Sequence, residues 1–178
     1  MQAFHVPGPA PLYTNSYLLI SDAGHGVIID PAAEPEQYTK LLQEHSASLT
    51  AILCTHGHYD HVGSAQELCR STGAKLYCEA ADLRNDQLYP LSQADSGYEE
   101  GAAVTVDELA FMVWHTPGHT PGQICLWMAD QQVLFTADHV LFDITPNITN
   151  WEGVDDSLGN YLDLSLIHIS EPTRRSYI

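Results

Sequence analysis

The sequence predicts an α/β (α+β) protein with a single domain. Two observations carry this prediction: short β-rich runs alternate with segments of helical period in the first half, and strands outnumber helices in the second half. The size agrees, because 178 residues, of which 44% are hydrophobic, can fill one core and leave little room for another. We therefore expect one mixed fold built around β-sheet.

The first expected elements are two strands, residues 16–20 and 26–30. The turn composition of residues 21–24 joins them as a hairpin, and Pro31 ends the second strand. A surface helix should follow over residues 34–45. It has a proline suited to a first helical turn, and its larger apolar residues share one face; they are Tyr38, Leu41 and Leu42.

The next strand leads into a cluster of histidines. Residues 50–54 have the composition of a buried strand and run directly into the histidine-rich residues 55–61. These histidines are therefore expected on a loop at the C-terminal end of a strand. Residues 64–71 are helical in pattern and end at Gly73, and residues 75–78 predict another strand.

The rest of the chain is predicted to be richer in strands than in helices. The expected strands are residues 109–115, 123–128 and 132–136. Short helices are expected at 80–86 and 155–163, and loops over the polar residues 87–101 and the Pro- and Asn-containing residues 144–153.

The last fifteen residues differ in kind from those before them. Within residues 164–178, the stretch LSLIHISEPTR resembles the in-frame translation of an adapter used to build sequencing libraries. We therefore expect a domain of residues 1–163 that is cut short, followed by a non-native tail. An ordinary strand and tail is the alternative.

The charge of the chain argues against two classes of partner. Six Lys and Arg residues against 23 Asp and Glu residues give 6 − 23 = −17, and no basic cluster is present. A nucleic-acid backbone or an anionic membrane is therefore not expected to bind. A small-molecule substrate fits better, and the oligomeric state is left open.

Neither secretion nor a disulfide framework is indicated. The N-terminal residues lack a basic start followed by an apolar run, and no apolar stretch approaches the roughly 18 residues that cross a bilayer. The four cysteines include no CxxC pair. We expect a cytoplasmic protein with reduced thiols; Cys54, on a buried strand, should serve core packing.

Histidine is the residue type that points to chemistry. The chain has ten histidines, and three lie within six residues, at His56, His58 and His61, with Asp60 between them. Imidazole and carboxylate groups this close together offer four metal ligands from one short segment. A coincidental surface cluster is the alternative interpretation.

Two further candidate ligands follow later strands. His119 stands in TPGHTPG and Asp138 in FTADH, each on a turn just past a β-rich run. A histidine between two Pro-Gly pairs is by itself more often an ordinary loop residue. Together with the first cluster, both side chains become candidate ligands.

This set of motifs resembles the metallo-β-lactamase superfamily of hydrolases in spacing and in order. The resemblance covers residues 12–163 and is carried by HxHxDH, TPGHT and TAD. It implies an αββα sandwich of two similar halves, the second half incomplete here, with metals at one edge of the sheets. The matched residues are His56, His58, Asp60, His61, His119 and Asp138.

The resemblance also implies a role for each matched residue. His56, His58 and His119 would hold a first metal ion. Asp60 and His61 would hold a second, with Asp138 bridging both ions; these roles belong to the family. Asp60 would in addition act in catalysis, by orienting the attacking hydroxide.

One ligand of the family pattern is not evident. The second site is usually completed by a histidine on a loop after the next helix, and the remaining histidine downstream of His139 is His168, inside the suspected tail. We therefore predict that the first metal site forms and that the second binds its ion weakly.

Imidazole and carboxylate ligands suit Zn²⁺ and also Fe or Mn, and no thiolate stands near the motifs. We expect zinc. Two such ions lower the pKa of a bound water toward neutrality and polarise the substrate's carbonyl or phosphoryl oxygen, so the expected reaction class is hydrolysis.

Several functions share these ligands. A thioesterase of the hydroxyacylglutathione hydrolase type fits best, acting on a thioester or another small ester-like substrate. A β-lactamase is disfavoured by the missing export signal, and a tRNA-processing nuclease by the charge of −17. A mononuclear iron sulfur dioxygenase and a non-catalytic descendant that binds ligand in the old pocket are the alternatives.

Other residues near the motifs have open roles. His115 and His139 flank candidate ligands and are candidates for hydrogen bonds that orient them. Substrate choice is expected to depend on loops 83–101 and 143–153. Their aromatic residues either line a pocket or pack in the core; they are Tyr89, Tyr98 and Trp151.

Overall fold

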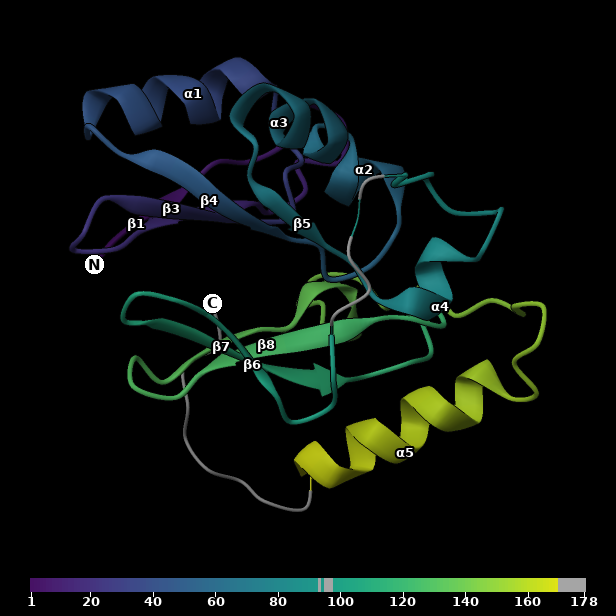
Figure 1. Cartoon of the computed structure of the whole chain (residues 1–178). Coiled ribbons are helices and arrows are strands. Elements are labelled where there is room, and N and C mark those ends of the chain that lie inside the picture. Colours follow the sequence, from purple (N-terminus) through teal and green to yellow (C-terminus); the bar gives the residue numbers. More distant parts are fainter. Residues whose placement is uncertain (93, 95–97, 170–178) are drawn as a thin grey trace.

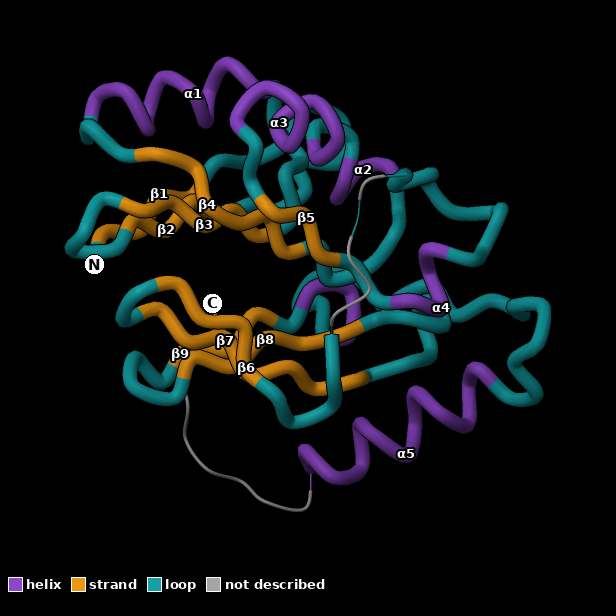
Figure 2. The backbone as a smooth tube through the Cα atoms, viewed as in Figure 1, coloured by secondary structure: helices purple, strands orange, loops and turns teal. Residues whose placement is uncertain are grey.

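Two β-sheets stack face to face in the computed structural model, which describes residues 1–92, 94 and 98–169, with side chains as far as residue 164. Helices α1 and α3 cover the outer face of the first sheet, and helix α5 lies outside the second (Figure 1). The backbone trace shows the same four layers (Figure 2). The predicted αββα sandwich is confirmed.

The first sheet is mixed, with strand order β1-β2-β3-β4-β5. Strands β1, β2 and β3 pair antiparallel, whereas β3, β4 and β5 pair parallel. The parallel pairs require crossover connections, and helices supply them. The elements are β1 (Gln2–His5), β2 (Tyr17–Ile20), β3 (His25–Ile29), α1 (Pro35–Glu44), β4 (Ser48–Leu53), α2 (Tyr59–Val62), α3 (Ala65–Thr72) and β5 (Lys75–Tyr77).

The second sheet is an antiparallel meander with strand order β6-β7-β8-β9. It is followed by a short 3-10 turn and a long helix. The elements of this half are α4 (Ala80–Leu83), β6 (Ala103–Val106), β7 (Leu109–His115), β8 (Ile124–Met128), β9 (Val133–Phe135), η1 (Ala137–His139) and α5 (Ser157–Ile169).

The first sheet is buried on both faces, which explains its nearly continuous apolar strands. Leu18, Ile28 and Ile52 face the helices and pack with the α1 residue Tyr38. The alternate residues of the same strands face the second sheet, where Leu53 joins a separate core cluster. Because side chains alternate along a strand, a sheet between two layers needs apolar residues at successive positions. The prediction that Cys54 packs in a core is confirmed.

Helix ends follow signals that the sequence carries. Pro35 occupies the first turn of α1, and Tyr38 and Leu42 are its buried residues. Helix α3 ends at Gly73, whose φ of +75° is a left-handed conformation that favours glycine.

Strands β1 and β6 were not predicted from the sequence. Both lie at the edge of a sheet, and most of their residues are exposed or half-buried, so neither shows an apolar period. Helix α5 also continues to Ile169 rather than ending at residue 163. No Gly or Pro interrupts residues 160–169, so nothing in the sequence stops the helix there.

The connections at one end of the sandwich lie close together. Helices α2 and α4 lie at the same end in Figure 1, after β4 and β5 respectively. The turn between β7 and β8 and the turn after β9 reach this end as well. Within the described residues no helix is both long and apolar enough to cross a membrane.

Candidate metal centre

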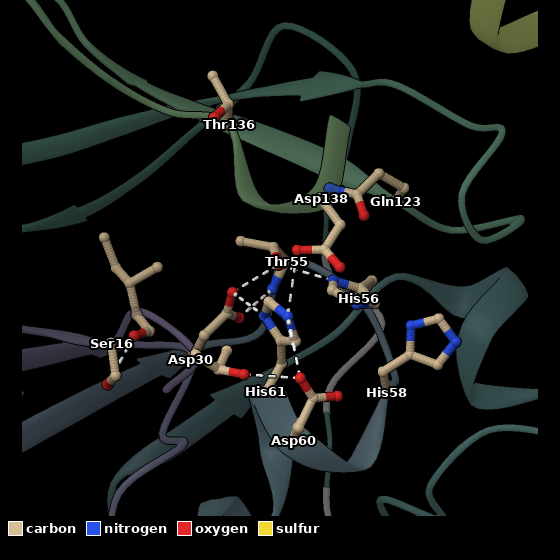
Figure 3. A network of polar contacts seen from close by, with 12 residues as sticks. Ser16, Asp30, Thr55, His56, His58, Asp60, His61, Gln123, Thr136 and Asp138 are labelled. Atoms are coloured by element: carbon tan, nitrogen blue, oxygen red, sulfur yellow. Dashed lines mark hydrogen bonds and ion pairs between the residues drawn. The ribbon is translucent and has the colours of Figure 1, made fainter. Parts of the chain in front are cut away.

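The segment after β4 begins as a loop and ends as a helical turn. His56 and His58 precede helix α2, whose backbone closes on His58: the amides of His61 and Val62 donate to its carbonyl, at 3.0 and 3.1 Å. The expectation of a loop over the whole segment is corrected in this respect. The turn places Asp60 and His61 beside the histidines (Figure 3).

Three imidazoles form a compact group. Ring nitrogens of His56, His58 and His119 all lie within 4.8 Å of one another, and His58 Nδ1 is 2.9 Å from His119 Nε2. His56 and His119 are buried. Residues separated by 61 positions in the sequence therefore meet at the end of the sandwich.

A second, more acidic group adjoins these imidazoles. The two oxygens of Asp138 each lie 3.3 Å from a histidine nitrogen, one from His61 Nε2 and the other from His119 Nε2. Asp60 Oδ2 is 3.7 Å from His61 Nε2. The structure thus brings all six predicted ligands into one cluster, with Asp138 between the two groups; their function as ligands remains a prediction.

Hydrogen bonds turn the free nitrogens of three histidines toward the cluster. His119 Nδ1 donates to the carbonyl of Asn147 at 2.7 Å, and His61 Nδ1 donates to Asp30 at 3.0 Å. His56 Nδ1 donates to Thr55 Oγ1, and the Thr55 hydroxyl in turn donates a hydrogen bond to Asp30. Each Nε2 is thereby turned toward the cluster, as in metal sites where the second ring nitrogen is fixed by a hydrogen bond.

The surroundings of His56 Nε2 show whether a cation would fit between the imidazoles. It is a buried nitrogen without a hydrogen-bond partner among the described residues. A buried polar atom left unpaired is costly, whereas a cation between three imidazoles pairs it. The donors are nitrogen and carboxylate oxygen, which suit Zn²⁺, Fe or Mn. The residues present fit a metal ion.

Asp30 is a buried residue beside the cluster that the sequence interpretation missed. It follows β3 with a φ of +49°, a left-handed conformation uncommon for aspartate. Its buried carboxylate accepts bonds from the Thr55 amide at 2.7 Å, the Thr55 hydroxyl at 2.6 Å and His61. Asp30 thereby fixes two histidines, His61 directly and His56 through Thr55. Its position at the C-terminal end of a buried strand was the available signal.

Asp82 in α4 was also missed, and it ties the two histidine-bearing loops together. Its carboxylate accepts from the Gly57 amide at 2.8 Å, the Gly122 amide at 2.6 Å and Thr120 Oγ1 at 2.8 Å. Burial raises the pKa of Asp82 to about 6, because it outweighs these three bonds. At Gly122 a Cβ would lie 2.8 Å from Asp82 Oδ1, so any larger residue there would displace this carboxylate.

The two groups differ in charge. Burial holds the pKa of His56 well below 6.5 and lowers the pKa of His58 to about 4, with help from the neighbouring imidazoles. Burial also acts on His61, but its hydrogen bonds to Asp138 and Asp30 prevail and raise its pKa to about 10. His56 and His58 are therefore neutral at pH 7, as metal ligands must be.

Two further contacts position ligands. Thr14 Oγ1 donates to Asp60 Oδ2 at 2.6 Å, from the loop before β2. Trp151 Nε1 donates to the backbone carbonyl of His119 at 3.0 Å, and its ring centroid is 6.1 Å from that of His58. Of the aromatic residues expected at a pocket, Trp151 thus supports the histidine group.

The other expected neighbours have different surroundings. Tyr98 is buried and stacks on Tyr77 in the core, so the packing interpretation holds for it. Tyr89 packs on Tyr59 and lines a shallow cleft beside His58. His115 Nδ1 lies 4.0 Å from Glu100, and the His139 ring packs on Tyr161. Neither of these two contacts involves a candidate ligand, so an orienting role for His115 and His139 stays a prediction.

A cleft beside the cluster only partly uses the loops expected to form it. Residues 12–15 and 140–144 provide much of its lining, and only Asp143 and Ile144 come from loop 143–153. Loop 83–101 contributes instead to the shallow cleft. His168 lies outside the side chains that the structure describes.

Comparison with known proteins identifies relatives of this chain. The family model of the metallo-beta-lactamase superfamily matches residues 9–172. Hydroxyacylglutathione hydrolase GloC of Haemophilus influenzae is 32% identical over 142 residues, which are 72% of this chain and 66% of that protein. A hydroxyacylglutathione hydrolase of Cereibacter sphaeroides is 37% identical over 135 residues, 74% of this chain and 50% of that protein. The chain thus spans half to two thirds of these curated relatives.

Solved structures agree on the fold. The crystal structure of TTHA1623 in a di-iron-bound form has a TM-score of 0.76 and 28% identity, covering 98% of this chain and 90% of that chain. ETHE1 from Myxococcus xanthus has a TM-score of 0.78 and 24% identity, covering 99% and 74%, and this likeness shows the fold alone. The chain therefore belongs to the metallo-β-lactamase superfamily, whose members bind metal ions and are mostly hydrolases.

Proposed function

We propose that this protein is a metal-dependent hydrolase that acts with a metal-activated water on a thioester or another small ester-like substrate. One observation carries the proposal: the buried, unpartnered Nε2 of His56 lies in a group of three imidazoles that adjoins Asp138 and His61. Such a group is complete only with a cation between its nitrogens.

The assignment of ligands follows the two groups. His56, His58 and His119 would hold the first ion, Asp60 and His61 the second, and Asp138 both. Bound metal would supply a water whose pKa is lowered toward neutrality and would polarise the substrate carbonyl. We propose zinc, with the second ion held more weakly because it draws on fewer ligands among the described side chains.

The chain's own residues would handle the proton. The carboxylate of Asp60, fixed by Thr14, would accept a hydrogen bond from the attacking hydroxide and orient it. The hydroxide oxygen bonds to the acyl carbon as the carbon–sulfur bond breaks, and the departing thiolate takes up the remaining proton, which leaves a carboxylate and a thiol. Asp30 keeps His61 turned inward throughout.

Thioester hydrolysis is supported by relatives, and a small-molecule substrate is supported by the charge. The hydroxyacylglutathione hydrolases of Haemophilus influenzae and Cereibacter sphaeroides share 32% and 37% identity with this chain. The formal charge of −17 opposes nucleic acids and anionic membranes as partners. We propose a small-molecule substrate and a cytoplasmic location.

A mononuclear iron sulfur dioxygenase is the second candidate. His119 Nε2 lies 3.3 Å from Asp138 Oδ2 and within 4.8 Å of a His56 nitrogen, so two histidines and one carboxylate converge. This is the ligand set typical of non-haem iron oxygenases. Iron in the purified protein, with oxygen consumption on a persulfide and no thioester hydrolysis, would favour this candidate.

Metal analysis together with a substrate panel tests the proposal. We expect the purified chain to contain zinc and to hydrolyse S-lactoylglutathione or a simpler thioester faster than a lactone or a phosphodiester. His56→Ala should lose both metal and activity, whereas His45→Ala, a change of an exposed histidine outside the cluster, should lose neither. Bound metal without turnover of any substrate would instead indicate a non-catalytic binding protein.

A further inference from the structure

A cleft of about 460 Å³ lies beside the acidic side of the cluster and is lined by Asp60, His61 and Asp138. Its walls come from two segments far apart in the sequence, residues 12–15 before β2 and residues 140–144 after η1. Under the proposed function, a molecule in this cleft touches the reacting groups. The lining of the cleft therefore bears on substrate choice.

The walls carry an unusual concentration of exposed apolar side chains. Nine large hydrophobic residues are exposed in the described part of the chain, and five of them line this cleft. Phe142, Ile144 and Leu12 are 72%, 70% and 66% exposed. Contiguous exposed apolar groups at a concave site mark a ligand-binding surface. We call these five residues the apolar rim: Leu12, Tyr13, Val140, Phe142 and Ile144.

The turn that presents Leu12 and Tyr13 is built into the fold. Tyr13 has a φ of +51°, a left-handed conformation that is strained for an aromatic residue. Two backbone bonds hold the turn, from Tyr13 to Pro9 at 3.1 Å and from Gly8 to Thr14 at 2.9 Å. Since Thr14 also binds Asp60, one turn sets both the apolar rim and the candidate catalytic carboxylate.

The charged residues on the walls of the cleft disfavour a negative charge on the substrate away from the metals. Neither lysine nor arginine lines this cleft or the shallow cleft beside His58. Four carboxylates line the larger one: Asp30, Asp60, Asp138 and Asp143. Metal ions would offset the carboxylates in the cluster, but Asp143 lies on the wall segment with the apolar rim. A carboxylate on the substrate would meet repulsion there.

We propose that this cleft takes the uncharged, apolar acyl group of the ester or thioester, and that acyl groups bearing a carboxylate are rejected. This inference rests on the proposed hydrolase function, which it deepens by naming the substrate class. The chemistry that recognises the substrate is burial of hydrocarbon against the apolar rim, next to the residues that would activate water.

A matched series of acyl groups on one neutral thiol, N-acetylcysteamine, tests the proposal on the metal-loaded full chain. We expect kcat/KM to rise roughly three-fold per added methylene from acetyl to hexanoyl. The succinyl thioester should be roughly 30-fold poorer than the butyryl thioester. Phe142→Ala should lower kcat/KM for hexanoyl roughly ten-fold and for acetyl less than about three-fold.

Leu158→Ala is the matched control, because Leu158 is also exposed but lies on α5, outside the cleft lining. It should leave the whole series unchanged. Equal rates for all acyl lengths, or a preference for succinyl, would overturn the proposal. So would a dimer that Phe142→Ala dissociates, since the apolar rim would then be an interface between copies.

Binding separates failure of this proposal from failure of the proposed function. Calorimetry with the hexanoyl and succinyl amides of N-acetylethylenediamine, in which an amide replaces the reactive thioester and no free thiol can bind metal, requires no turnover. Tighter binding of the hexanoyl amide, weakened by Phe142→Ala, supports the cleft assignment even if no thioester is hydrolysed. Equal or tighter binding of the succinyl amide contradicts it even if hydrolysis occurs.

Discussion

The two ligand groups of the cluster are built differently. The imidazole group of His56, His58 and His119 is mostly buried, and burial keeps His56 and His58 neutral. The acidic group is more open, with the side chains of Asp60 and Asp138 33% and 25% exposed, and it includes a charged histidine paired with carboxylates. The neutral nitrogens of the imidazole group can bind an ion directly. In the acidic group, His61 must first lose a proton and its ion pair with Asp138 before it can bind one.

The largest effect should come from removing a nitrogen of the imidazole group. His119→Ala deletes one of three converging donors and also its contact with Asp138. We expect loss of the tightly bound ion and a fall in kcat/KM of roughly a thousand-fold or more. Metal content by mass spectrometry and steady-state kinetics measure both. Retention of a full ion per chain would show that the imidazole group is not the primary site.

A change in the residue that supports the acidic group should weaken the second ion more than the first. Asp30→Asn removes the carboxylate that orients His61, and loss of such a supporting residue costs roughly 10- to 100-fold in metal affinity. We expect the second ion to weaken by this factor. The first should weaken less, although Asp30 reaches His56 through Thr55. Titration with zinc against a chelating indicator resolves the two steps; equal weakening of both would contradict the comparison.

A smaller effect on metal binding is expected from removing the hydrogen bond that supports His119. Trp151→Phe keeps the ring but removes the bond from Nε1 to the His119 carbonyl. Loss of one hydrogen bond of about 1 kcal/mol predicts a roughly five-fold weaker first ion and an unchanged second ion. Trp127→Phe, in the stacked pair on the second sheet, is the matched control. The same indicator titration measures both variants.

The smallest effect is the pH dependence of stability that comes from Asp82, which joins the two histidine-bearing loops. Burial raises the pKa of Asp82 to about 6 from 3.8, so folding favours its protonated form. The stability that this group contributes is complete below pH 3.8 and is lost as the pH rises through 6. Between pH 5 and pH 7 the unfolding free energy of wild type should fall by roughly 1 kcal/mol relative to Asp82→Asn.

Denaturant unfolding of the metal-free protein at the two pH values measures this difference. If wild type instead gains stability relative to Asp82→Asn as the pH rises, the three donors stabilise the ionised carboxylate, and the predicted sign is wrong.

The sequence predicted the part of the site that local spacing encodes. One short segment contains His56, His58, Asp60 and His61, and His119 and Asp138 each follow a strand. Their positions after strands were enough to predict that they meet at one edge of the sheets. Asp30 and Asp82 were missed because their partners are 25 to 40 positions away, and no local period marks such contacts.

The same limit explains the errors in the fold and in the cleft. Strands β1 and β6 are exposed edges without an apolar period. The turn at residues 12–15 depends on a left-handed backbone at Tyr13. This conformation is uncommon for tyrosine, so the sequence does not predict it. The inner strands of the first sheet, by contrast, were predicted, because their apolar runs pack on two faces.

Anomalous diffraction from crystals of this chain grown with zinc tests most directly whether the cluster holds metal. We predict a strong peak bonded to imidazole nitrogens of His56, His58 and His119, and a weaker one near Asp60 and His61. Zinc absent from the three imidazoles, with His56 Nε2 paired to some other group, would contradict the assignment of a metal centre.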